Sequence, residues 1–278
     1  MSAAGEDGRN SGSHARSLLL TVLGEYVAPQ KAQTWTGTLV EALGTVGVRE
    51  KAARQALLRS ATDGWLVGER HGRRVRFGLS PEIHALLDAG ARRIYSFGAG
   101  RVDWDGRWLV VVASVPEEQR HLRHKLRTSL AWAGFGPLGQ GVWVCPDAGR
   151  EEEARRVVES LGAAVQATSF VGRHAGVGDE SALVARAWDL PELERRYASF
   201  LAEFGDAVPN DHEDVFRAQT RLVHAWRRFP FLDPGLPDSL LPPTWPGRRA
   251  RELFVRRHDE WALGAQAWFD ATDASSTA

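Results

Sequence analysis

A basic helix followed at once by a glycine-containing hairpin is the feature that most constrains this chain. Residues 48–66 read VREKAARQALLRSATDGWL, and residues 67–80 continue with VGERHGRRVRFGLS. The first stretch predicts a helix over 50–62, and the second predicts two strands joined at 71–74. This is the order of parts in a winged helix-turn-helix, whose recognition helix enters the major groove of DNA while the wing reaches the neighbouring backbone.

The predicted helix has an apolar side and a basic side. With about 100° between successive residues, five small or apolar residues share one side and can pack on the rest of the domain: Ala53, Ala56, Leu57, Ser60 and Ala61. The opposite side carries four polar side chains: Lys51, Arg54, Gln55 and Arg59. Arginine pairs with guanine and glutamine with adenine, while lysine and arginine also neutralise phosphates. We therefore expect Arg54, Gln55 and Arg59 to read bases and Lys51 to hold a phosphate.

The hairpin adds four basic side chains near its tip to this candidate interface: His71, Arg73, Arg74 and Arg76. From there they can reach phosphates beside the major groove. Helical patterns over 17–27 and 35–43 precede the basic helix, and Thr34 or Thr36 is expected to cap the second of them. A solvated helix face that binds nothing is the alternative. The hairpin and the preceding helices favour DNA binding.

Charge is distributed unevenly along a chain whose formal net charge is zero. Residues 16–79 hold ten Lys/Arg and five Asp/Glu, so this segment is +5 and the rest of the chain is −5. A basic head on an acidic body fits a protein that touches DNA at one end only.

Three features of the sequence bear on the compartment. No run approaches the ~20 apolar residues of a membrane span, and the first fifteen residues lack the apolar core of a signal peptide. The single cysteine, Cys145, cannot form an internal disulfide. We expect a cytoplasmic protein that does not contact the membrane.

The hydrophobic pattern predicts an α+β chain with three domains after a disordered tail over 1–15. We expect a winged helix-turn-helix domain with a linking helix over 16–95, a ferredoxin-like domain over 96–175 and an all-α domain over 176–278. The middle domain is predicted from strands at 108–113, 135–138, 142–145 and 164–171, with helices at 116–133 and 151–161. The order β-α-β-β-α-β is the ferredoxin-like plan.

The middle domain lacks the groups that catalysis would need. A metal-dependent nuclease of this shape needs a carboxylate at the end of its first strand, where this chain has Ser114. His121 and His124 can share a helix face, but no nearby carboxylate or cysteine completes a metal site. The many basic residues of that helix favour a solvated or interface face instead. We expect no catalytic residue, no metal and no cofactor, and hence a protein that is not an enzyme.

The C-terminal region reads as helices over 181–189, 190–204, 212–229 and 248–270, with a proline-rich loop over 229–246. Aromatic residues at helical spacing are expected to form mainly core. Four arginines flank the loop and are candidate anion-binding groups of an effector pocket: Arg227, Arg228, Arg248 and Arg249.

Five stretches together resemble the PaaX family, the phenylacetate-degradation repressors of bacteria. They are LLLTVLGEYV (18–27), the helix and hairpin stretch described above, RHKLRTSLAWAGFGPLGQGVWVCP (123–146), AWDLPELERRYASF (187–200) and RRFPFLDPGLPDSLLPPTWPGRRARELF (227–254). The resemblance spans roughly residues 16–270 in family order and includes all three domains, whereas a winged helix alone would be weak support.

The resemblance implies a dimeric repressor that binds a partly palindromic operator in double-stranded DNA. It implies a Cas2-like middle domain, similar to the small CRISPR-associated nuclease, and a C-terminal domain that helps form the homodimer and senses a ligand. The family's best-known effector is phenylacetyl-CoA, which implies release from the operator by an aryl- or acyl-CoA. The chain departs from the family at Ser114, where members often carry Asp, and at Ala61 and Thr62, where aliphatic residues are more usual.

Two other classes of function stay open on the sequence alone. A Cas2-like nuclease or an acyl-CoA hydrolase would need metal- or nucleophile-dependent turnover, and Ser114 argues against the nuclease. A ligand-independent architectural DNA-binding protein would show little sequence preference and no response to an effector.

Overall fold

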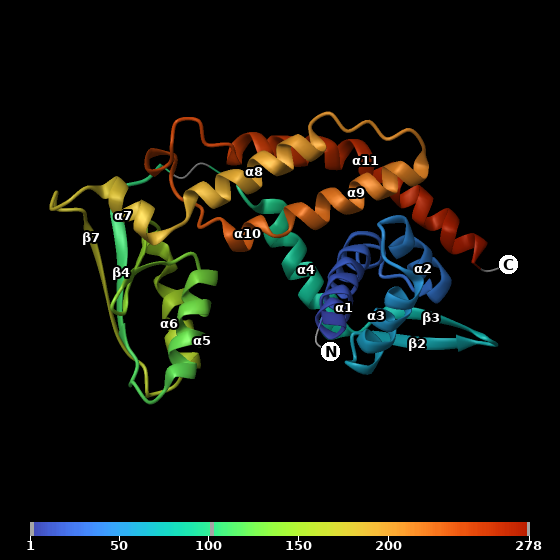
Figure 1. Ribbon diagram of the computed structural model, residues 1–278, viewed down its shortest axis with the longest axis horizontal. Coiled ribbons are helices and arrows are strands. Elements are labelled where there is room, and N and C mark those ends of the chain that lie inside the picture. The colour runs from blue at the N-terminus through green and yellow to red at the C-terminus, as the bar shows by residue number, and fades with distance from the viewer. Residues whose placement is uncertain (1–2, 101–102, 277–278) are drawn as a thin grey trace. The chain divides into compact units, whose positions relative to one another are not determined.

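The computed structural model describes residues 3–100 and 103–276, which form two compact units (Figure 1). Unit 1 takes the described residues up to Phe97, together with Phe200–Arg227 and those from Arg251 onward. Unit 2 takes Gly98–Ser199 and Arg228–Ala250. Among the helices of the described residues, none is long and apolar enough to cross a membrane.

The N-terminal part of unit 1 consists of helices and a small sheet. Its elements are α1 (Ala3–Val22), the π-helical turn η1 (Leu23–Val27), β1 (Thr34–Trp35), α2 (Thr36–Thr45), α3 (Glu50–Thr62), β2 (Leu66–His71), β3 (Arg74–Leu79) and α4 (Pro81–Ser96). The strand order is β1-β3-β2, and both strand pairs are antiparallel. The predicted bounds of the basic helix and the position of the hairpin are confirmed.

The hairpin between β2 and β3 closes with a two-residue loop. His71 pairs with Arg74 in the antiparallel register, which leaves Gly72 and Arg73 as the loop. Gly72 has φ = 63°, a left-handed conformation that two-residue hairpin loops require and that glycine adopts without steric cost.

The core of unit 1 combines residues from both ends of the chain. Buried aliphatic side chains of α1, α2 and α3, such as Leu19, Leu39 and Leu57, lie in one cluster with Phe216 and Phe269. The last two belong to α9 (His212–Trp226) and α11 (Gly247–Ser275). The helices predicted to form a separate domain over 176–278 are thus divided between the two units, because burial of their apolar faces needs partners from α1.

Residues 3–15, predicted as part of a disordered tail, are helical, since α1 begins at Ala3. Ala15 is fully buried in the core of unit 1, and Arg16 binds Asp63 at 2.6 Å. Core packing therefore continues before residue 17, where the sequence predicted the helix to begin. Once α1 has formed there, each further residue joins it at low entropic cost. Residues 1 and 2 lie outside the described part of the chain.

The first turn of α2 is capped differently from the prediction. Its N-cap is Trp35, which makes no side-chain cap, and Thr36 donates its hydroxyl to the Val75 carbonyl at 2.9 Å. The carboxylate of Asp273 in α11 instead accepts hydrogen bonds from the Trp35 N–H at 2.9 Å and from the Thr38 hydroxyl at 2.8 Å. A charge from the far end of the chain replaces the local threonine cap.

Unit 2 is built on a four-stranded antiparallel sheet. Its elements up to residue 173 are β4 (Arg107–Ser114), α5 (Arg120–Trp132), β5 (Gly136–Gly139), β6 (Val142–Cys145), η2 (Ala148–Arg150), α6 (Glu151–Ser160) and β7 (Gln166–Arg173). The strand order β5-β6-β4-β7 and the β-α-β-β-α-β sequence are those of the predicted ferredoxin-like fold. Helix α5 begins at Arg120 rather than at Pro116, because residues 116–119 form a turn closed by the Gln119 N–H and the Pro116 carbonyl at 3.0 Å.

The two faces of this sheet are covered by different segments. Helices α5 and α6 pack on one face around Leu109, Val111 and Trp143 (Figure 1). Trp108 and Val144 on the other face pack against α7 (Glu180–Ala187) and the proline-rich segment. The sheet is therefore buried on both sides of its central strands.

The remaining elements are α8 (Leu190–Phe204), α10 (Phe229–Leu232) and η3 (Asp238–Leu240). The helix predicted over 212–229 ends at Trp226, and α10 follows as a separate turn with Pro230 in its first positions. Proline has no N–H to continue a helix. Phe229 stacks on Tyr197 with ring centroids 4.2 Å apart, and the Tyr197 hydroxyl donates to Asp233 at 2.6 Å.

Candidate nucleic-acid interface

Helix α3 presents one buried side and one exposed side. Ala53, Ala56, Leu57 and Ser60 are buried, while the four predicted DNA-contacting side chains are exposed. Leu58 lies among them with 68% of its surface exposed. This leucine therefore contributes little to the core of unit 1.

Both arginines of the exposed face of α3, Arg54 and Arg59, lie close to other residues of unit 1. Arg54 pairs with Glu50 one turn earlier at 2.8 Å, and both side chains are more than half exposed, at 58% and 67%. Exposed pairs of this spacing are worth roughly 0.3–0.5 kcal/mol, so Arg54 can exchange Glu50 for another anion at little cost. The Arg59 guanidinium lies beside Gly12, where an added Cβ would stand 3.3 Å from Nη1.

Arg16 fixes the corner between α3 and the hairpin. Its guanidinium binds Asp63 at 2.6 Å, directly after the last residue of α3, and lies 3.7 Å from the ring centre of Trp65. Trp65 in turn precedes β2. These contacts hold the end of α3 and the start of the hairpin against α1.

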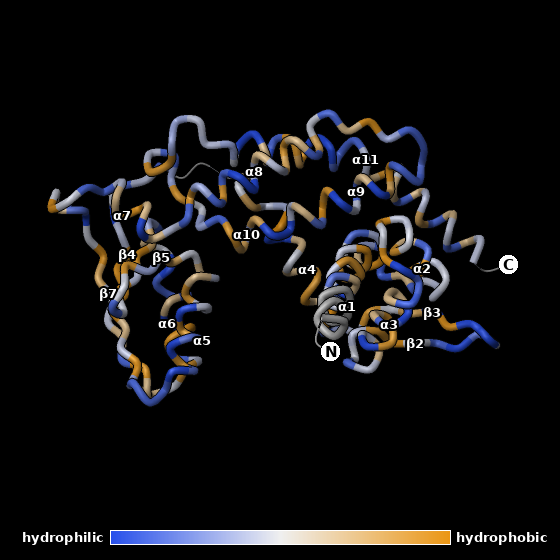
Figure 2. The backbone as a smooth tube through the Cα atoms, viewed as in Figure 1, coloured by the Kyte–Doolittle hydropathy of each residue, from blue (hydrophilic) through white to orange (hydrophobic). Residues whose placement is uncertain are grey.

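The tip of the hairpin is exposed and hydrophilic (Figure 2). Arg73 lies in its two-residue loop, and the neighbouring Arg74 donates to the carbonyl of Ser276 at 2.9 Å. His71 lies 3.3 Å from a carboxylate oxygen of Glu69 and edge-on to Trp35. Arg73 therefore lies in the exposed loop itself, while Arg74 and His71 have partners inside unit 1.

Arg76 differs from the other predicted phosphate contacts because it is held within the fold. Its Nη2 donates to the carbonyl of Gln33 at 3.0 Å and lies 3.4 Å from Asp273, and its guanidinium lies over the Trp35 ring. About a third of the side chain is exposed, at 34%. These contacts indicate a role in joining β3 to β1 and α11.

Sequence reasoning missed two basic side chains near the exposed face. Arg49 precedes α3 directly, and Arg70 lies on β2; both are exposed. Counting every basic residue of the stretch, rather than those on one helix face and at the hairpin tip, would have found them.

The four predicted effector arginines do not share one unit. Arg227 belongs to unit 1, where its Nη2 donates to the Ser17 hydroxyl at 2.7 Å. Arg228, Arg248 and Arg249 belong to unit 2 and are exposed. The Ser17 contact gives Arg227 a structural role within unit 1.

The described residues contain no group of three or more His, Cys, Asp or Glu side chains that could hold a metal ion. His121 and His124 are exposed on α5, and Ser114 ends β4. The single cysteine, Cys145, is buried, and this burial raises the pKa of its thiol to about 11. A thiol with such a pKa is protonated near neutral pH and is a poor nucleophile.

Three family models match successive parts of the chain. A model described as PaaX-like protein matches residues 14–83, one described as the PaaX protein central Cas2-like domain matches 101–184, and one described as the PaaX-like protein C-terminal domain matches 188–271. The Transcriptional repressor PaaX of Escherichia coli (strain K12) is 28% identical over 263 residues, which cover 91% of this chain and 82% of the relative.

A solved structure supports the fold. The uncharacterized protein Rv0674 from Mycobacterium tuberculosis aligns with a TM-score of 0.61 and 24% identity, over 90% of this chain and 96% of that one. The fold and the matches define a class of multidomain proteins with a Cas2-like middle domain and a helical C-terminal region. Within that class, the chain belongs to the PaaX family.

Proposed function

We propose that this protein is a transcriptional regulator that binds double-stranded DNA through a winged helix-turn-helix formed by α1–α3 and β1–β3. The observation that carries the proposal is the exposed basic face of α3 in the same unit as the basic β2–β3 hairpin. The name of the Escherichia coli relative, a transcriptional repressor, supports repression as the direction of control.

The exposed side chains divide into two proposed roles. Arg54 and Gln55 read base edges in the major groove, with Arg59 beside them, since bidentate side chains at such positions distinguish guanine and adenine. Lys51 and Arg73 hold phosphates, with Arg74 and His71 next to the tip. Arg76 positions the wing through Asp273 and Trp35.

A homodimer completes the proposed DNA-binding form. Two copies of α3 in a symmetric dimer would occupy major grooves about one helical turn, or a multiple of it, apart. Because the two protomers of a two-fold symmetric dimer present the same reading helix, the operator is expected to be partly palindromic.

We also propose that an acyl-CoA of the phenylacetyl-CoA type releases the protein from its operator. To move a population from mostly bound to mostly free, such an effector must prefer the released state by several kcal/mol. Arg228, Arg248 and Arg249 are the proposed phosphate contacts from the proline-rich segment. The proposed regulator acts by binding and release, without a catalytic step.

Binding to the gene's own upstream region tests this function. Fluorescence anisotropy at ~150 mM salt compares that duplex with a scrambled one, because affinities without a stated salt concentration cannot be compared. Each titration is repeated with phenylacetyl-CoA, other acyl-CoAs and CoA.

Three outcomes separate the proposals. Specific binding that one thioester releases supports the regulator and its effector class. Specific binding that no thioester changes retains the regulator and rejects the acyl-CoA. Equal binding to both duplexes rejects the regulator in favour of an architectural DNA-binding protein.

A further inference from the structure

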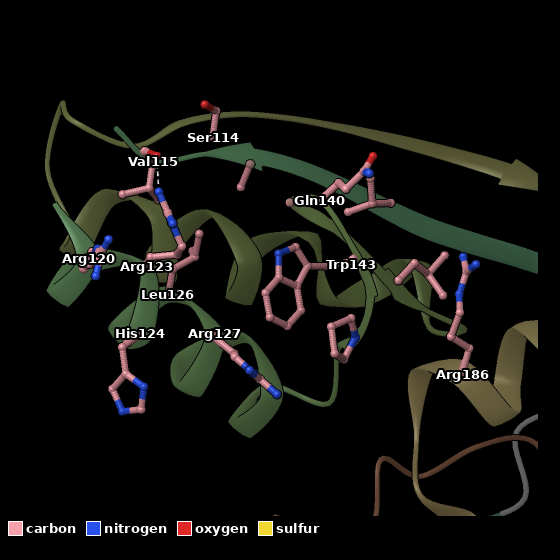
Figure 3. A pocket seen from close by; sticks show the side chains of 16 residues that line it. Ser114, Val115, Arg120, Arg123, His124, Leu126, Arg127, Gln140, Trp143 and Arg186 are labelled. Carbon is pink, nitrogen blue, oxygen red and sulfur yellow. Dashed lines mark hydrogen bonds between the residues drawn. The ribbon is translucent and has the colours of Figure 1, made fainter. Parts of the chain in front are cut away.

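A cavity of about 950 Å³ lies in unit 2, within the ferredoxin-like domain (Figure 3). Its walls come from the end of β4, one face of α5, the β5–β6 hairpin and α7. All of these segments belong to the same compact unit. Cavities of this size hold small organic ligands.

The lining is strongly basic. It contains four arginines and His124 and no Asp or Glu: Arg120, Arg123, Arg127 and Arg186. Figure 3 shows Arg120 and Arg123 towards one end and Arg186 towards the other, with Trp143 between them. Cations that line one cavity with no carboxylate among the lining residues raise the local concentration of anions.

The cavity arginines have few partners in the described residues. Arg123 donates to the Val115 carbonyl at 3.4 Å. Among the described residues, the ion pairs of unit 2 involve other arginines, such as Arg150 with Asp147 and Arg195 with Glu192. The neighbouring helix α6 shows the contrast, since its Arg155 pairs with Glu152 at 3.0 Å. The cavity arginines are therefore without ion pairs among the described residues, although Glu117 and Glu118 lie near Arg120.

Helical spacing explains why three of the arginines line the same cavity. Positions 120, 123 and 127 of α5 lie on one side of a helix, and the sequence pattern predicts that side as a solvated or interface face. The β5–β6 hairpin and Arg186 of α7 turn that face into the wall of a cavity.

The middle of the cavity is apolar and aromatic. Trp143 lines it with only 6% of its surface exposed, and Pro137 and Leu138 lie beside it. The Trp143 indole N–H is buried and has no acceptor among the described residues. The basic ends and the apolar middle of the cavity together suit a ligand with an anionic part and an apolar part.

We propose that this cavity binds a small organic phosphate, with its phosphate groups on the arginines and an apolar or aromatic part against Trp143. Planar guanidinium groups bind phosphate oxygens in pairs, and an indole face accepts a flat or aliphatic group. A duplex would present its phosphates to a convex or flat basic surface, whereas these arginines surround a recess. The site is distinct from the proline-rich segment and does not depend on the proposed DNA binding.

Isothermal titration calorimetry on the full chain tests the proposal with ATP, CoA, acetyl-CoA, inorganic pyrophosphate and a short blunt-ended duplex. The variants are Arg127→Gln and Arg186→Gln, which remove one charge from each side of the cavity. Arg156→Gln removes an exposed arginine of α6 outside the lining and is the matched control. Arg248→Gln tests the proline-rich segment, proposed above as the acyl-CoA contact: binding lost in this variant and retained in both cavity variants would place the ligand there and overturn the cavity proposal.

We expect one or more of the organic phosphates to bind, with affinity reduced about tenfold or more in each cavity variant and unchanged in the Arg156 variant, because loss of a charge-assisted hydrogen bond costs at least that factor. Absence of binding by every organic phosphate at millimolar concentration would overturn the proposal, as would equal losses in the control. If pyrophosphate binds as tightly as the organic phosphates, the apolar part of the ligand contributes no affinity, and the proposed contact with Trp143 is rejected. Binding of the duplex alone, lost in the cavity variants, replaces the small ligand with nucleic acid.

A second readout does not depend on how the variants fold. Trp143→Phe assigns the Trp143 indole N–H resonance in a spectrum of 15N-tryptophan-labelled protein. That resonance should shift on titration with the phosphate that binds in calorimetry. A saturating ligand that leaves the Trp143 resonance unmoved and shifts other tryptophans places the ligand elsewhere.

Discussion

The carboxylate of Asp273 accepts a hydrogen bond from the Thr38 hydroxyl at 2.8 Å and joins the end of α11 to the first turn of α2. The same oxygen accepts from the Thr34 hydroxyl at 2.6 Å and the Trp35 N–H at 2.9 Å. Thr34 and Thr38 are buried, so their donors have little access to water. The last helix is therefore part of the proposed DNA-binding unit.

Asp273→Ala should lower the free energy of unfolding by about 3 kcal/mol, because hydrogen bonds to a charged group contribute about 1.5–3 kcal/mol and buried donors lose their acceptor. Urea denaturation measures the change. Asp270→Ala is the control, since its carboxylate accepts from Gln266 on the exposed side of α11. Equal destabilisation by both variants would reject the capping role.

A second junction gives unit 1 a pH dependence. His258 Nε2 lies 2.9 Å from Glu25 Oε1, which also accepts from Gln219 at 2.8 Å, and the Tyr95 hydroxyl donates to the other oxygen. Burial opposes ionisation of Glu25, but the hydrogen bond and charge of His258 outweigh it and hold the pKa of Glu25 below its usual 4.5. Burial likewise lowers the pKa of His258, but Glu25, with help from Asp259, raises it above 6.5.

The pair should therefore stabilise the protein most at intermediate pH. The His258 contribution is present below 6.5 and is lost as pH rises through its raised pKa, while the Glu25 contribution is present above 4.5 and is lost as pH falls through its lowered pKa. Urea denaturation from about pH 4 to 9 measures both limbs. Glu25→Gln should make the free energy of unfolding depend less on pH at both ends of this range. His121→Gln, at an exposed site on α5, should leave the pH dependence unchanged. An unchanged pH profile in Glu25→Gln would contradict this assignment.

Arg54→Ala and Arg73→Ala should weaken DNA binding in different ways. Loss of Arg54 should cost about 1–3 kcal/mol on the cognate duplex and relax one base position, because a base contact is lost. Loss of Arg73 should weaken cognate and scrambled duplexes alike and reduce the salt slope by about one. Anisotropy titrations over a salt series measure both effects; matching losses on both DNAs for Arg54→Ala would reject base reading.

Arg76→Ala should act on the fold more than on phosphate contacts. The substitution removes the contacts to Gln33, Asp273 and Trp35, so a lower unfolding temperature is expected, with a salt slope close to that of the unaltered protein. Calorimetric unfolding and salt-dependent anisotropy together measure this. A reduced slope with unchanged stability would restore the phosphate role predicted from sequence.

Gly141→Ala should destabilise unit 2. Gly141 has φ = 79°, and an added Cβ would lie 2.2 Å from the Ala113 carbonyl oxygen, so the hairpin would have to move away from β4. We expect a loss of 2 kcal/mol or more, about the upper range for strained backbone sites, in urea denaturation. Gly172→Ala is the control, since nothing lies within 4 Å of its added Cβ. If Gly141→Ala lowers the free energy of unfolding no more than Gly172→Ala does, the contact with Ala113 adds no cost and the prediction is wrong.

Local pattern was sufficient for much of the fold. The alternation of small and basic residues over 50–62 predicted α3 with its observed bounds and its buried side. The order of strands and helices over 107–173 predicted the ferredoxin-like plan, which the strand order confirms. These features depend on residues within one or two turns or strands of each other, where 3.6- and two-residue periods determine which side is buried.

Contacts between distant residues were decided by the tertiary structure alone. The helical N-terminal segment depends on packing of Ala15 in the core, and the caps of α2 come from Asp273. Arg76 lies in the predicted hairpin, yet its partner Asp273 comes from α11, and Arg186 meets the α5 arginines across a cavity. Periodicity assigns a side chain to a face but cannot name what covers that face, because the free energy of such contacts depends on which distant segments the fold brings together.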